Sequence, residues 1–447
     1  MPARLPSFRT YDIRGIVPGE LSADLMHRVG RAVAEWSGAA EVIVGRDARL
    51  SSPALAEALM LGLRAGGVTV LDLGVVTTPL LNYAVAELKR HGLMVTASHN
   101  PKEYNGVKVI DPRVEQVYYG RGLEQIEALV TRADRPARGR SEGALRLRTI
   151  LPAYQAMLAA RFRGIAADAP AVVLDCSNGV GGLPLGVLEE LGLRHTLLYH
   201  VPDGDFPHHG CDTLRPENLE DLRRAVRERG AGLGIMFDGD ADRIAFVDER
   251  GEIARLDLVF ALLARQELAR VPGRVFYDLR FSRAVPQEIE RLGGAAVMLR
   301  VGNPFHKEAL HRHDDALLAG ELSGHIMYRE HFGIDDPLYA ALKLIALLAR
   351  SGKSLAEHLR PLACYAGSGE RRIETHAPAA LVERARRRYA DAAISTVDGI
   401  TVAYPHWWFN LRPSNTEPVA KLVIEAETPE QLAAHETELL ALFGANA

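Results

Sequence analysis

The chain has 447 residues, of which 47% are hydrophobic and 25% charged, and its formal net charge is −4 at pH 7. This length is too great for one ordinary core and predicts about two to four domains, and the composition excludes a disordered, collagenous or low-complexity protein. Because the sequence has no basic excess and no basic run, we expect no nucleic-acid partner.

The cysteines and apolar stretches give no sign of a secreted or membrane protein. The three cysteines are far apart, so they predict neither a disulfide framework nor a CxxC metal pair: Cys176, Cys211 and Cys364. The N-terminal residues lack the apolar run of a secretory signal. The most apolar long stretch, 337–350, is too short to span a bilayer and contains Lys343, so it predicts a buried or amphipathic helix. We expect a cytoplasmic protein with no membrane partner and no obligate protein partner.

One pattern occurs three times along the chain. Short β-branched or aromatic runs at 41–45, 171–175 and 274–278 predict strands, and each is followed by a loop and a helix-like stretch that ends at glycine. A second strand-like run follows each helix. These β-α-β units predict three related α/β domains with mixed, mainly parallel sheets. A single large doubly wound sheet that reuses its commonest unit is the alternative.

The last eighty residues have a different pattern. A helix-like stretch at 378–392 precedes Asp398-Gly399, a strong hairpin signal between β-branched residues, and a strand-like run at 419–427 precedes a helix capped at Thr428. This pattern predicts a small α+β domain at the C-terminus. The predicted domains are 1–140, 141–248, 249–364 and 365–447.

The first candidate for chemistry is a serine on a loop after a strand. The apolar run that begins at Leu93 ends at Thr96, and Ser98 follows. Ligands of open α/β sheets bind at the carboxyl ends of strands, so Ser98 is well placed to be a nucleophile. The GxSxG elbow of esterases is absent, since Thr96 and Asn100 occupy its glycine positions. An ordinary turn is the alternative for this stretch taken alone.

The second candidate is an alternation of three aspartates. Asp238, Asp240 and Asp242 lie between two apolar runs, and carboxylates this close repel one another unless a cation lies among them. Hard oxygen ligands in small number suit Mg²⁺. An EF-hand is disfavoured because Arg243 stands where that loop needs glycine and because the flanking runs resemble strands. A solvated acidic turn remains the alternative.

Two further loops have the composition of anion- and hydroxyl-binding segments. In the first, over 320–336, Glu321, Ser323 and His325 alternate beside two glycines. The second, over 410–418, combines a cation with hydroxyl and amide groups: Arg412, Ser414, Asn415 and Thr416. Either loop alone is also consistent with an ordinary polar turn. Together, the four loops supply a nucleophile, a metal site, a carboxylate for sugar hydroxyls and a phosphate cradle, which is the set that phosphoryl transfer needs.

With these motifs in place, the chain resembles the α-D-phosphohexomutase superfamily, in particular its bacterial phosphomannomutase/phosphoglucomutase group. The resemblance spans the whole chain through strings in the family's order: TYDIRG (10–15), GRDARLSS (45–52), TASHNP (96–101), YNGVK (104–108), DGDADR (238–243), GELSGH (320–325) and RPSNTEP (412–418). It implies four domains around a central cleft. It also implies reversible interconversion of hexose 1-phosphate and hexose 6-phosphate, of mannose or glucose, with hexose 1,6-bisphosphate as intermediate and activator.

The resemblance also implies roles for individual residues. Ser98 corresponds to the phosphoserine, and Mg²⁺ is implied at Ser98, Asp238, Asp240 and Asp242. The implied catalytic residues are Ser98, the general acid/base Lys108, the phosphate-facing Arg14 and Arg243, and His99. The implied substrate-binding residues are Tyr11, Arg280, Gly302, Asn303, Glu321, Ser323, His325, Arg412, Ser414, Asn415 and Thr416. We further expect a lowered pKa for Lys108, since a lysine among cations loses its proton more easily.

Two departures from the family pattern concern the substrate. Asn303 stands where histidine is usual, and Cys211-Asp212-Thr213 replaces a common Pro-Asn-Pro. Phosphoglucosamine mutase is one alternative, although Tyr104 and Leu322 favour neutral hexoses. A Mg²⁺-dependent sugar phosphatase is the other, although a hydrolase has no need of the phosphate cradle at 412–416.

Overall fold

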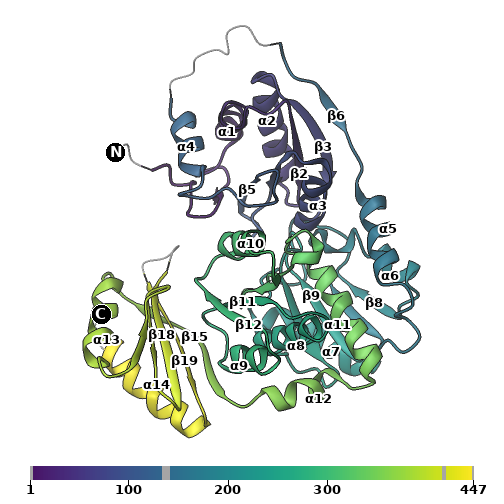
Figure 1. The fold of residues 1–447 in the computed structure, drawn as a ribbon. Coiled ribbons are helices and arrows are strands. Elements are labelled where there is room, and N and C mark those ends of the chain that lie inside the picture. The colour runs from purple at the N-terminus through teal and green to yellow at the C-terminus, as the bar shows by residue number, and fades with distance from the viewer. Residues whose placement is uncertain (1–3, 133–140, 415–418, 445–447) are drawn as a thin grey trace. The chain divides into compact units, whose positions relative to one another are not determined.

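The computed structural model describes residues 4–132, 141–414 and 419–444 (Figure 1). The chain divides into two compact units. The first comprises Met1–Leu256, Leu310–Asp314 and Ser323–Ala356, and the second comprises Asp257–Ala309, Asp315–Leu322 and Glu357–Ala447. Four α/β domains make up the chain, and the strands lie in separate sheets. The alternative of one large doubly wound sheet is therefore wrong.

The first sheet of unit 1 has the order β1-β5-β4-β2-β3-β6. Its strands are β1 (Ile13–Ile16), β2 (Glu41–Arg46), β3 (Thr69–Val75), β4 (His91–Val95), β5 (Tyr104–Ile110) and β6 (Leu145–Leu147). β2 is parallel to β3 and β4, and β3 is parallel to β6, whereas β5 is antiparallel to both β4 and β1. The helices of this part are α1 (Ala23–Ser37), α2 (Ser52–Ala65), α3 (Thr78–Leu88) and α4 (Leu123–Val130).

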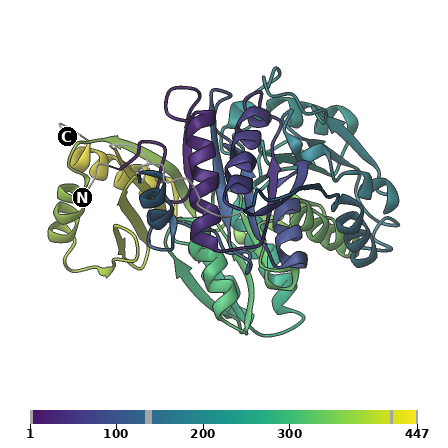
Figure 2. The same cartoon turned by 90° about the horizontal axis from the view of Figure 1, so that it is seen from above.

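Helices α1 and α2 lie side by side, as the two views show (Figure 2). Two glycines allow their backbones to touch. A Cβ atom on Gly30 would lie 2.2 Å from the carbonyl oxygen of Leu59, and one on Gly62 would lie 2.0 Å from that of His27. Since any side chain would separate the helices, glycine at both positions fixes their spacing.

The second sheet of unit 1 has the order β10-β9-β7-β8, in which β7 is parallel to β8 and β9, and β10 is antiparallel to β9. Its strands are β7 (Val172–Asp175), β8 (His195–Leu198), β9 (Leu233–Phe237) and β10 (Ile244–Asp248). The other elements of unit 1 are α5 (Leu151–Arg161), η1 (Val180–Gly182), α6 (Gly186–Glu190), η2 (Pro216–Leu219), α7 (Glu220–Arg229), β14 (Ile326–Tyr328), η3 (Arg329–His331) and α11 (Pro337–Ser351).

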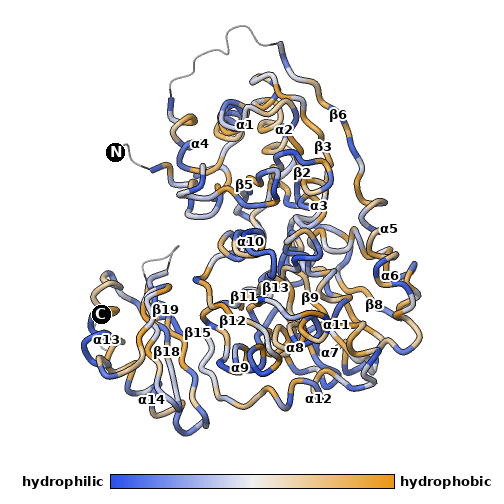
Figure 3. The backbone as a smooth tube through the Cα atoms, in the orientation of Figure 1, coloured by the Kyte–Doolittle hydropathy of each residue, from blue (hydrophilic) through white to orange (hydrophobic). Residues whose placement is uncertain are grey.

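Helix α11 confirms the buried helix predicted over 337–350. The carboxylate of Asp336 caps its first turn by accepting the backbone N–H of Tyr339. The helix is largely apolar (Figure 3), and most of its residues are buried. Among the described residues, no helix is both long and apolar enough to cross a membrane.

In unit 2, three parallel strands lie in the order β12-β11-β13. These strands and their neighbouring helices are α8 (Leu256–Leu268), β11 (Arg274–Asp278), α9 (Ala284–Arg291), β12 (Ala295–Leu299), α10 (Asn303–Arg312) and β13 (Ala316–Gly320), and α12 (Leu355–Leu359) and η4 (Arg360–Leu362) follow later in the chain. With the sheets of unit 1, this arrangement confirms three α/β domains with mainly parallel sheets.

The C-terminal sheet is antiparallel throughout, with the order β15-β19-β18-β17-β16. Its elements are β15 (Ala366–Glu374), α13 (Pro378–Arg388), β16 (Ala393–Ser395), β17 (Ile400–Ala403), β18 (Trp407–Pro413), β19 (Val419–Ala426) and α14 (Pro429–Phe443). The hairpin at Asp398-Gly399 and the cap at Thr428 are confirmed. The helix predicted over 378–392 ends earlier, at Arg388, because Tyr389 turns into the core against Phe409.

Candidate active site

Ser98 lies on the loop between β4 and β5, as predicted. Its side chain is buried, and its φ of +51° is in the left-handed region that residues other than glycine rarely adopt. The backbone N–H of Ser98 donates to the Thr96 hydroxyl oxygen at 2.9 Å. This hydrogen bond and those of Arg49 stabilise the left-handed backbone of Ser98, a conformation that costs free energy without such support.

Arg49 holds this loop by its backbone. The guanidinium is buried and donates to four carbonyl oxygens, those of Ser98, Asn100, Pro101 and Tyr104, at 2.7, 2.7, 2.7 and 3.1 Å. Its Nε donates to the Asp47 carboxylate at 3.2 Å. Arg49 lies within the string GRDARLSS (45–52), but nothing in the sequence pattern predicted this role. No local pattern distinguishes an arginine that will be buried against a loop from one that is solvated.

The Ser98 hydroxyl joins this loop to the aspartate loop. Ser98 Oγ donates to Asp238 Oδ2 at 2.6 Å and lies 3.2 Å from His99 Nδ1. A Cβ atom on Gly239 would lie 2.6 Å from the Ser98 carbonyl oxygen, so only glycine permits the two loops to approach this closely. The predicted nucleophile and the first predicted metal ligand are thus in direct contact.

The aspartate loop connects β9 to β10 and buries its three carboxylates. Asp238, Asp240 and Asp242 are at most 2% exposed, and their ligand oxygens all lie within 4.8 Å of one another. Asp238 Oδ1 accepts the backbone N–H groups of Asp242 and Arg243, both at 3.0 Å. The solvated acidic turn is therefore wrong, because these carboxylates are out of water. The EF-hand is excluded as well, because the flanking elements are strands.

The donor set of this cluster fits a hard divalent cation. Asp240 Oδ1 and Asp242 Oδ1 are buried and, within the described part of the chain, have no hydrogen-bond partner. Buried carboxylate oxygens are normally paired, so such orphans indicate a missing ligand. Burial, together with repulsion from Asp240 and Asp242, raises the pKa of Asp238 well above its usual range. Oxygen ligands of this kind suit Mg²⁺.

Two residues of the first sheet's domain bind the aspartate loop. The Thr78 hydroxyl donates to Asp240 Oδ2 at 2.6 Å, and the Thr78 backbone N–H donates to the Asp240 carbonyl at 2.9 Å. Lys108, buried on β5, donates to Asp240 Oδ2 at 2.7 Å and also to the Asp242 carboxylate. Of these two residues, Lys108 was predicted from the sequence and Thr78 was not.

The expected lowering of the Lys108 pKa is wrong in this structure. Burial and the Arg14 cation do lower it, but the pull of Asp240 and Asp242 is larger, so the pKa of Lys108 is raised. The carboxylates decide the direction because they contact the ammonium directly. In return, Lys108 holds the pKa of Asp240 below its usual range despite burial.

Cations and histidines complete the cluster in unit 1. Arg14, on β1, donates to Asn100 Oδ1 at 2.7 Å, and Arg243 Nε donates to His325 Nε2 at 3.3 Å. Because a guanidinium only donates, His325 Nε2 is the acceptor in the second bond. Burial lowers the pKa of His99 well below its usual value, and Arg243 and Arg14 lower it further, so His99 is neutral at pH 7.

Two further predicted site residues of unit 1 are Tyr11 and Ser323. Tyr11 precedes β1, and its carbonyl oxygen accepts the Gln116 side-chain amide at 2.7 Å. Ser323 is half-buried just before β14.

In unit 2, Arg280, Gly302 and Glu321 gather at the carboxyl ends of parallel strands, where ligands of such sheets bind. Arg280 follows β11 and is paired with the Asp278 carboxylate. Glu321 Oε1 follows β13 and accepts the Gly302 backbone N–H at 2.8 Å. Asn303 begins α10, next to Gly302.

Arg412 lies on β18, and its guanidinium is almost entirely buried. Its Nη2 donates to Glu370 Oε2 at 2.6 Å. The Ser414 backbone N–H donates to the Val419 carbonyl at 2.9 Å. Asn415 and Thr416 lie outside the described residues. Glu370 lies on β15, and no sequence pattern predicted a role for it.

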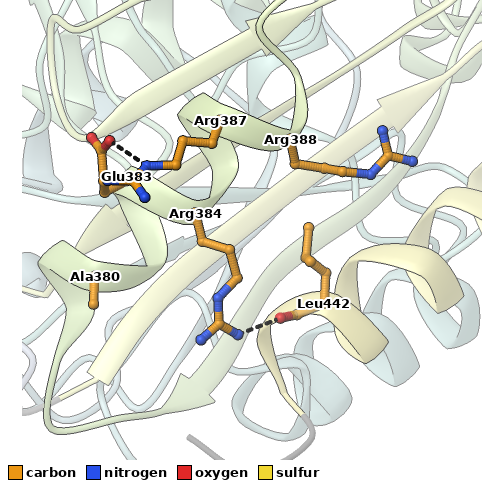
Figure 4. A pocket seen from close by; sticks show the side chains of 6 residues that line it. All are labelled: Ala380, Glu383, Arg384, Arg387, Arg388 and Leu442. Atoms are coloured by element: carbon orange, nitrogen blue, oxygen red, sulfur yellow. Dashed lines mark hydrogen bonds and ion pairs between the residues drawn. The ribbon is translucent and has the colours of Figure 1, made fainter.

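A surface pocket on the C-terminal domain is a different kind of feature. Ala380, Glu383, Arg384, Arg387, Arg388 and Leu442 line it (Figure 4). Its arginines bind protein groups: Arg384 the Leu442 carbonyl at 2.8 Å, and Arg387 the Glu383 carboxylate at 2.9 Å. Because these cations already have protein partners, the buried cluster around Ser98 is the better candidate active site.

Family models match almost the whole chain in four consecutive parts. They are described as phosphoglucomutase/phosphomannomutase alpha/beta/alpha domain I, over residues 5–135, domain II, over 152–251, domain III, over 256–365, and the C-terminal domain, over 372–442.

Individual proteins are similar over nearly their full length. Phosphomannomutase/phosphoglucomutase of Pseudomonas putida is 36% identical over 452 residues, which covers 97% of this chain and 94% of the relative. The Pseudomonas aeruginosa protein of the same name is 37% identical over 445 residues, with the same coverage. A crystal structure of a phosphoglucomutase/phosphomannomutase family protein from Burkholderia thailandensis superposes with a TM-score of 0.88 at 32% identity, over 98% of this chain and 97% of that one.

Proposed function

Because the chain belongs to the phosphoglucomutase/phosphomannomutase family, we propose that it interconverts mannose or glucose 1-phosphate and the corresponding 6-phosphate, with Ser98 as the phosphoryl carrier. It is an enzyme of phosphoryl transfer within a sugar phosphate. The observation that carries the role of Ser98 is its 2.6 Å hydrogen bond to Asp238, at the edge of a buried three-aspartate cluster. A phosphorylated Ser98 would hold its phosphate beside those carboxylates.

We assign a Mg²⁺ site to Asp238, Asp240, Asp242 and phosphorylated Ser98. The two carboxylate oxygens without partners support this assignment. When bound, the cation would neutralise the carboxylates and the charge that develops on the transferring phosphoryl group. Arg14 and Arg243, both near the Ser98 loop, are the proposed protein cations for the same charge.

In the proposed step, a sugar hydroxyl oxygen attacks the phosphorus of phosphorylated Ser98, and the bond from phosphorus to Ser98 Oγ breaks. Lys108, the proposed acid and base, accepts the hydroxyl proton in its neutral form. Ser98 Oγ leaves with the electron pair of the broken bond and takes that proton from Lys108, and the reverse step moves the proton back. Asp240 and Asp242 hold Lys108 in its charged form here. The same carboxylates would hold that proton less strongly when they bind a cation, which suits a group that must exchange it. Neutral His99, 3.2 Å from Ser98 Oγ, is proposed to orient the hydroxyl.

The sugar phosphate is proposed to bind through the other predicted residues. Arg412 with Ser414, Asn415 and Thr416 would take the phosphate that is not reacting. Hydroxyl contacts are assigned to Tyr11, Arg280, Gly302, Asn303, Glu321, Ser323 and His325. The product of the first transfer is a hexose 1,6-bisphosphate, so added bisphosphate would activate the enzyme by phosphorylating Ser98. Since the similar proteins are named phosphomannomutase/phosphoglucomutase, glucosamine phosphate and simple hydrolysis are less favoured.

Intact-mass analysis tests the carrier. Enzyme incubated with glucose 1,6-bisphosphate should gain the mass of one phosphoryl group, and Ser98→Ala should neither gain it nor turn over. Ser351→Ala, at the exposed end of α11, is the matched control and should behave as the parent enzyme. A Ser98→Ala variant with full turnover would contradict the proposal. Kinetics with mannose, glucose and glucosamine 1-phosphates, with a phosphate-release assay, decide the substrate and the reaction.

A further inference from the structure

The carboxylate of Glu370 lies among three cations of unit 2. Glu370 Oε2 is 2.6 Å from Arg412 Nη2 and 3.8 Å from Arg280 Nη1, and Glu370 Oε1 is 3.3 Å from Lys421 Nζ. Arg280 is already paired closely with Asp278. Glu370 is therefore the internal anion that Arg412 and Lys421 share.

Strand register explains why an anion is needed there. Arg412 on β18 is directly opposite Lys421 on β19. Like charges directly opposite each other in a sheet are destabilising. Glu370 lies on β15, at the point where its pairing with β19 shifts register, and such irregularities re-aim side chains. The irregularity accompanies a glutamate whose two oxygens reach the two cations.

The site retains the capacity to bind a further anion. Arg412 Nε is buried and, among the described residues, has no hydrogen-bond partner. One carboxylate does not neutralise both Arg412 and Lys421. Burial raises the pKa of Glu370, but Arg412, Arg280 and Lys421 lower it by more, so its carboxylate stays charged. A phosphate dianion offers more charge and more acceptor oxygens than this carboxylate.

We propose that Lys421 is a further ligand of the non-reacting phosphate and that Glu370 sets the affinity of that site, because its carboxylate competes with the phosphate for Arg412 and Lys421. This inference rests on the proposed function, in which Arg412 binds that phosphate. A sugar bisphosphate must exchange its two phosphates between transfers, so it has to be released from each site. A carboxylate that takes over the cations lowers the cost of release, at the expense of affinity.

The direction in which KM changes in one variant, Glu370→Gln, tests the role of Glu370. Glu370→Gln keeps the shape and removes the charge, so KM for both glucose 1-phosphate and glucose 6-phosphate should fall by about two- to fivefold, the range for a part-exposed ion pair. The inhibition constant of inorganic phosphate should fall with it. If Glu370 only orients Arg412, both constants rise. A rise, or no change, overturns the role of Glu370.

Two further variants complete the test. Glu374 lies on the same strand as Glu370, and its exposed carboxylate is paired with Arg372. Glu374→Gln should therefore leave KM and the inhibition constant of inorganic phosphate unchanged. Lys421→Met should raise KM for both substrates, and an unchanged KM overturns the role of Lys421. Melting curves check that each variant is folded.

Arg412→Ala separates this inference from the proposed function on which it rests. If Arg412→Ala leaves KM and kcat/KM unchanged, the phosphate assignment itself fails. If Arg412→Ala is impaired but Glu370→Gln raises KM, only the inference about Glu370 fails.

Discussion

The Arg49 guanidinium donates to the carbonyl oxygens of both Ser98 and Asn100 at 2.7 Å, and so it holds the loop on both sides of His99. A carbonyl bound at each end fixes the peptide planes between them. This contact explains how Ser98 keeps a left-handed φ and still directs its hydroxyl at Asp238. Arg49 touches no reacting atom, so it acts by positioning Ser98.

The first prediction concerns this positioning. Arg49→Lys keeps the charge, but one ammonium has three donors and cannot reach all four carbonyls that the planar guanidinium binds. We expect kcat to fall by about ten- to a hundredfold, because small displacements of reacting groups are costly. KM should change little, since the buried Arg49 guanidinium already donates to backbone carbonyl oxygens and to Asp47. Steady-state kinetics, which give kcat and KM separately, and the rate of Ser98 phosphorylation test this expectation.

The control for Arg49 is an exposed arginine of the same domain. Arg113 is 66% exposed and paired with Asp111, so Arg113→Lys should keep normal kinetics. An Arg49→Lys enzyme that phosphorylates Ser98 at the normal rate would show that the loop holds its shape without the clamp.

Local pattern predicted the elements and the loops that carry the chemistry. The runs at 41–45 and 274–278 became β2 and β11, and both Ser98 and Asp238 follow strands as expected. These features depend on hydrophobic periodicity, on turn residues and on glycines that end helices, and all of these are visible in residues close together in the sequence. The domain boundaries at 140, 248 and 364 stay predictions.

What the sequence did not predict depends on contacts between distant residues. Thr78 binds Asp240 across 162 positions, and Arg49 binds Ser98 across 49. The wrong direction for the Lys108 pKa has the same origin. Cations and carboxylates both surround that lysine, and only the distances decide which dominates. Such balances cannot be obtained from residue types alone.

The second prediction concerns the metal. Asp240→Asn removes one of the three charges, so Mg²⁺ affinity, measured by calorimetry, should fall by about tenfold or more, and turnover should fall with it. Asp248→Asn is the control. Asp248 binds the backbone N–H groups of Arg250 and Glu252 through Oδ1, which an asparagine oxygen can also accept, so it should bind Mg²⁺ normally. Full activity in chelator-treated enzyme without added Mg²⁺ would refute the metal site.

The third prediction concerns acid stability. Burial raises the pKa of Glu330, but hydrogen bonds from Lys343 and Tyr339 outweigh it and lower the pKa from 4.5 to about 2. Since the folded-state pKa is below the unfolded one, charged Glu330 stabilises the fold above about pH 4.5, and this contribution disappears as the pH falls towards 2. Glu330→Gln should therefore unfold at lower urea than the parent at pH 7, with the difference shrinking below pH 4.5.

The control for this titration is Glu374→Gln, which changes an exposed carboxylate and should shift the urea midpoint little at any pH. A Glu330→Gln difference that stays constant between pH 7 and pH 3 would mean that the side chain stabilises by packing and not by charge.

The last prediction concerns Arg412. A mutase presents its sugar in two orientations, so one site must accept both a 1-phosphate and a 6-phosphate. A buried guanidinium recognises the phosphate itself and is indifferent to the orientation of the ring. Hydrogen bonds to charged groups contribute roughly 1.5–3 kcal/mol each. Arg412→Ala should therefore lower kcat/KM by about ten- to a hundredfold, at about 1.4 kcal/mol per tenfold. The loss should be equal for glucose 1-phosphate and glucose 6-phosphate, while Ser98 phosphorylation by bisphosphate at saturation and Mg²⁺ binding persist. A variant impaired with only one of the two isomers would show that Arg412 serves a single orientation, and one common phosphate site could then not support both halves of the cycle.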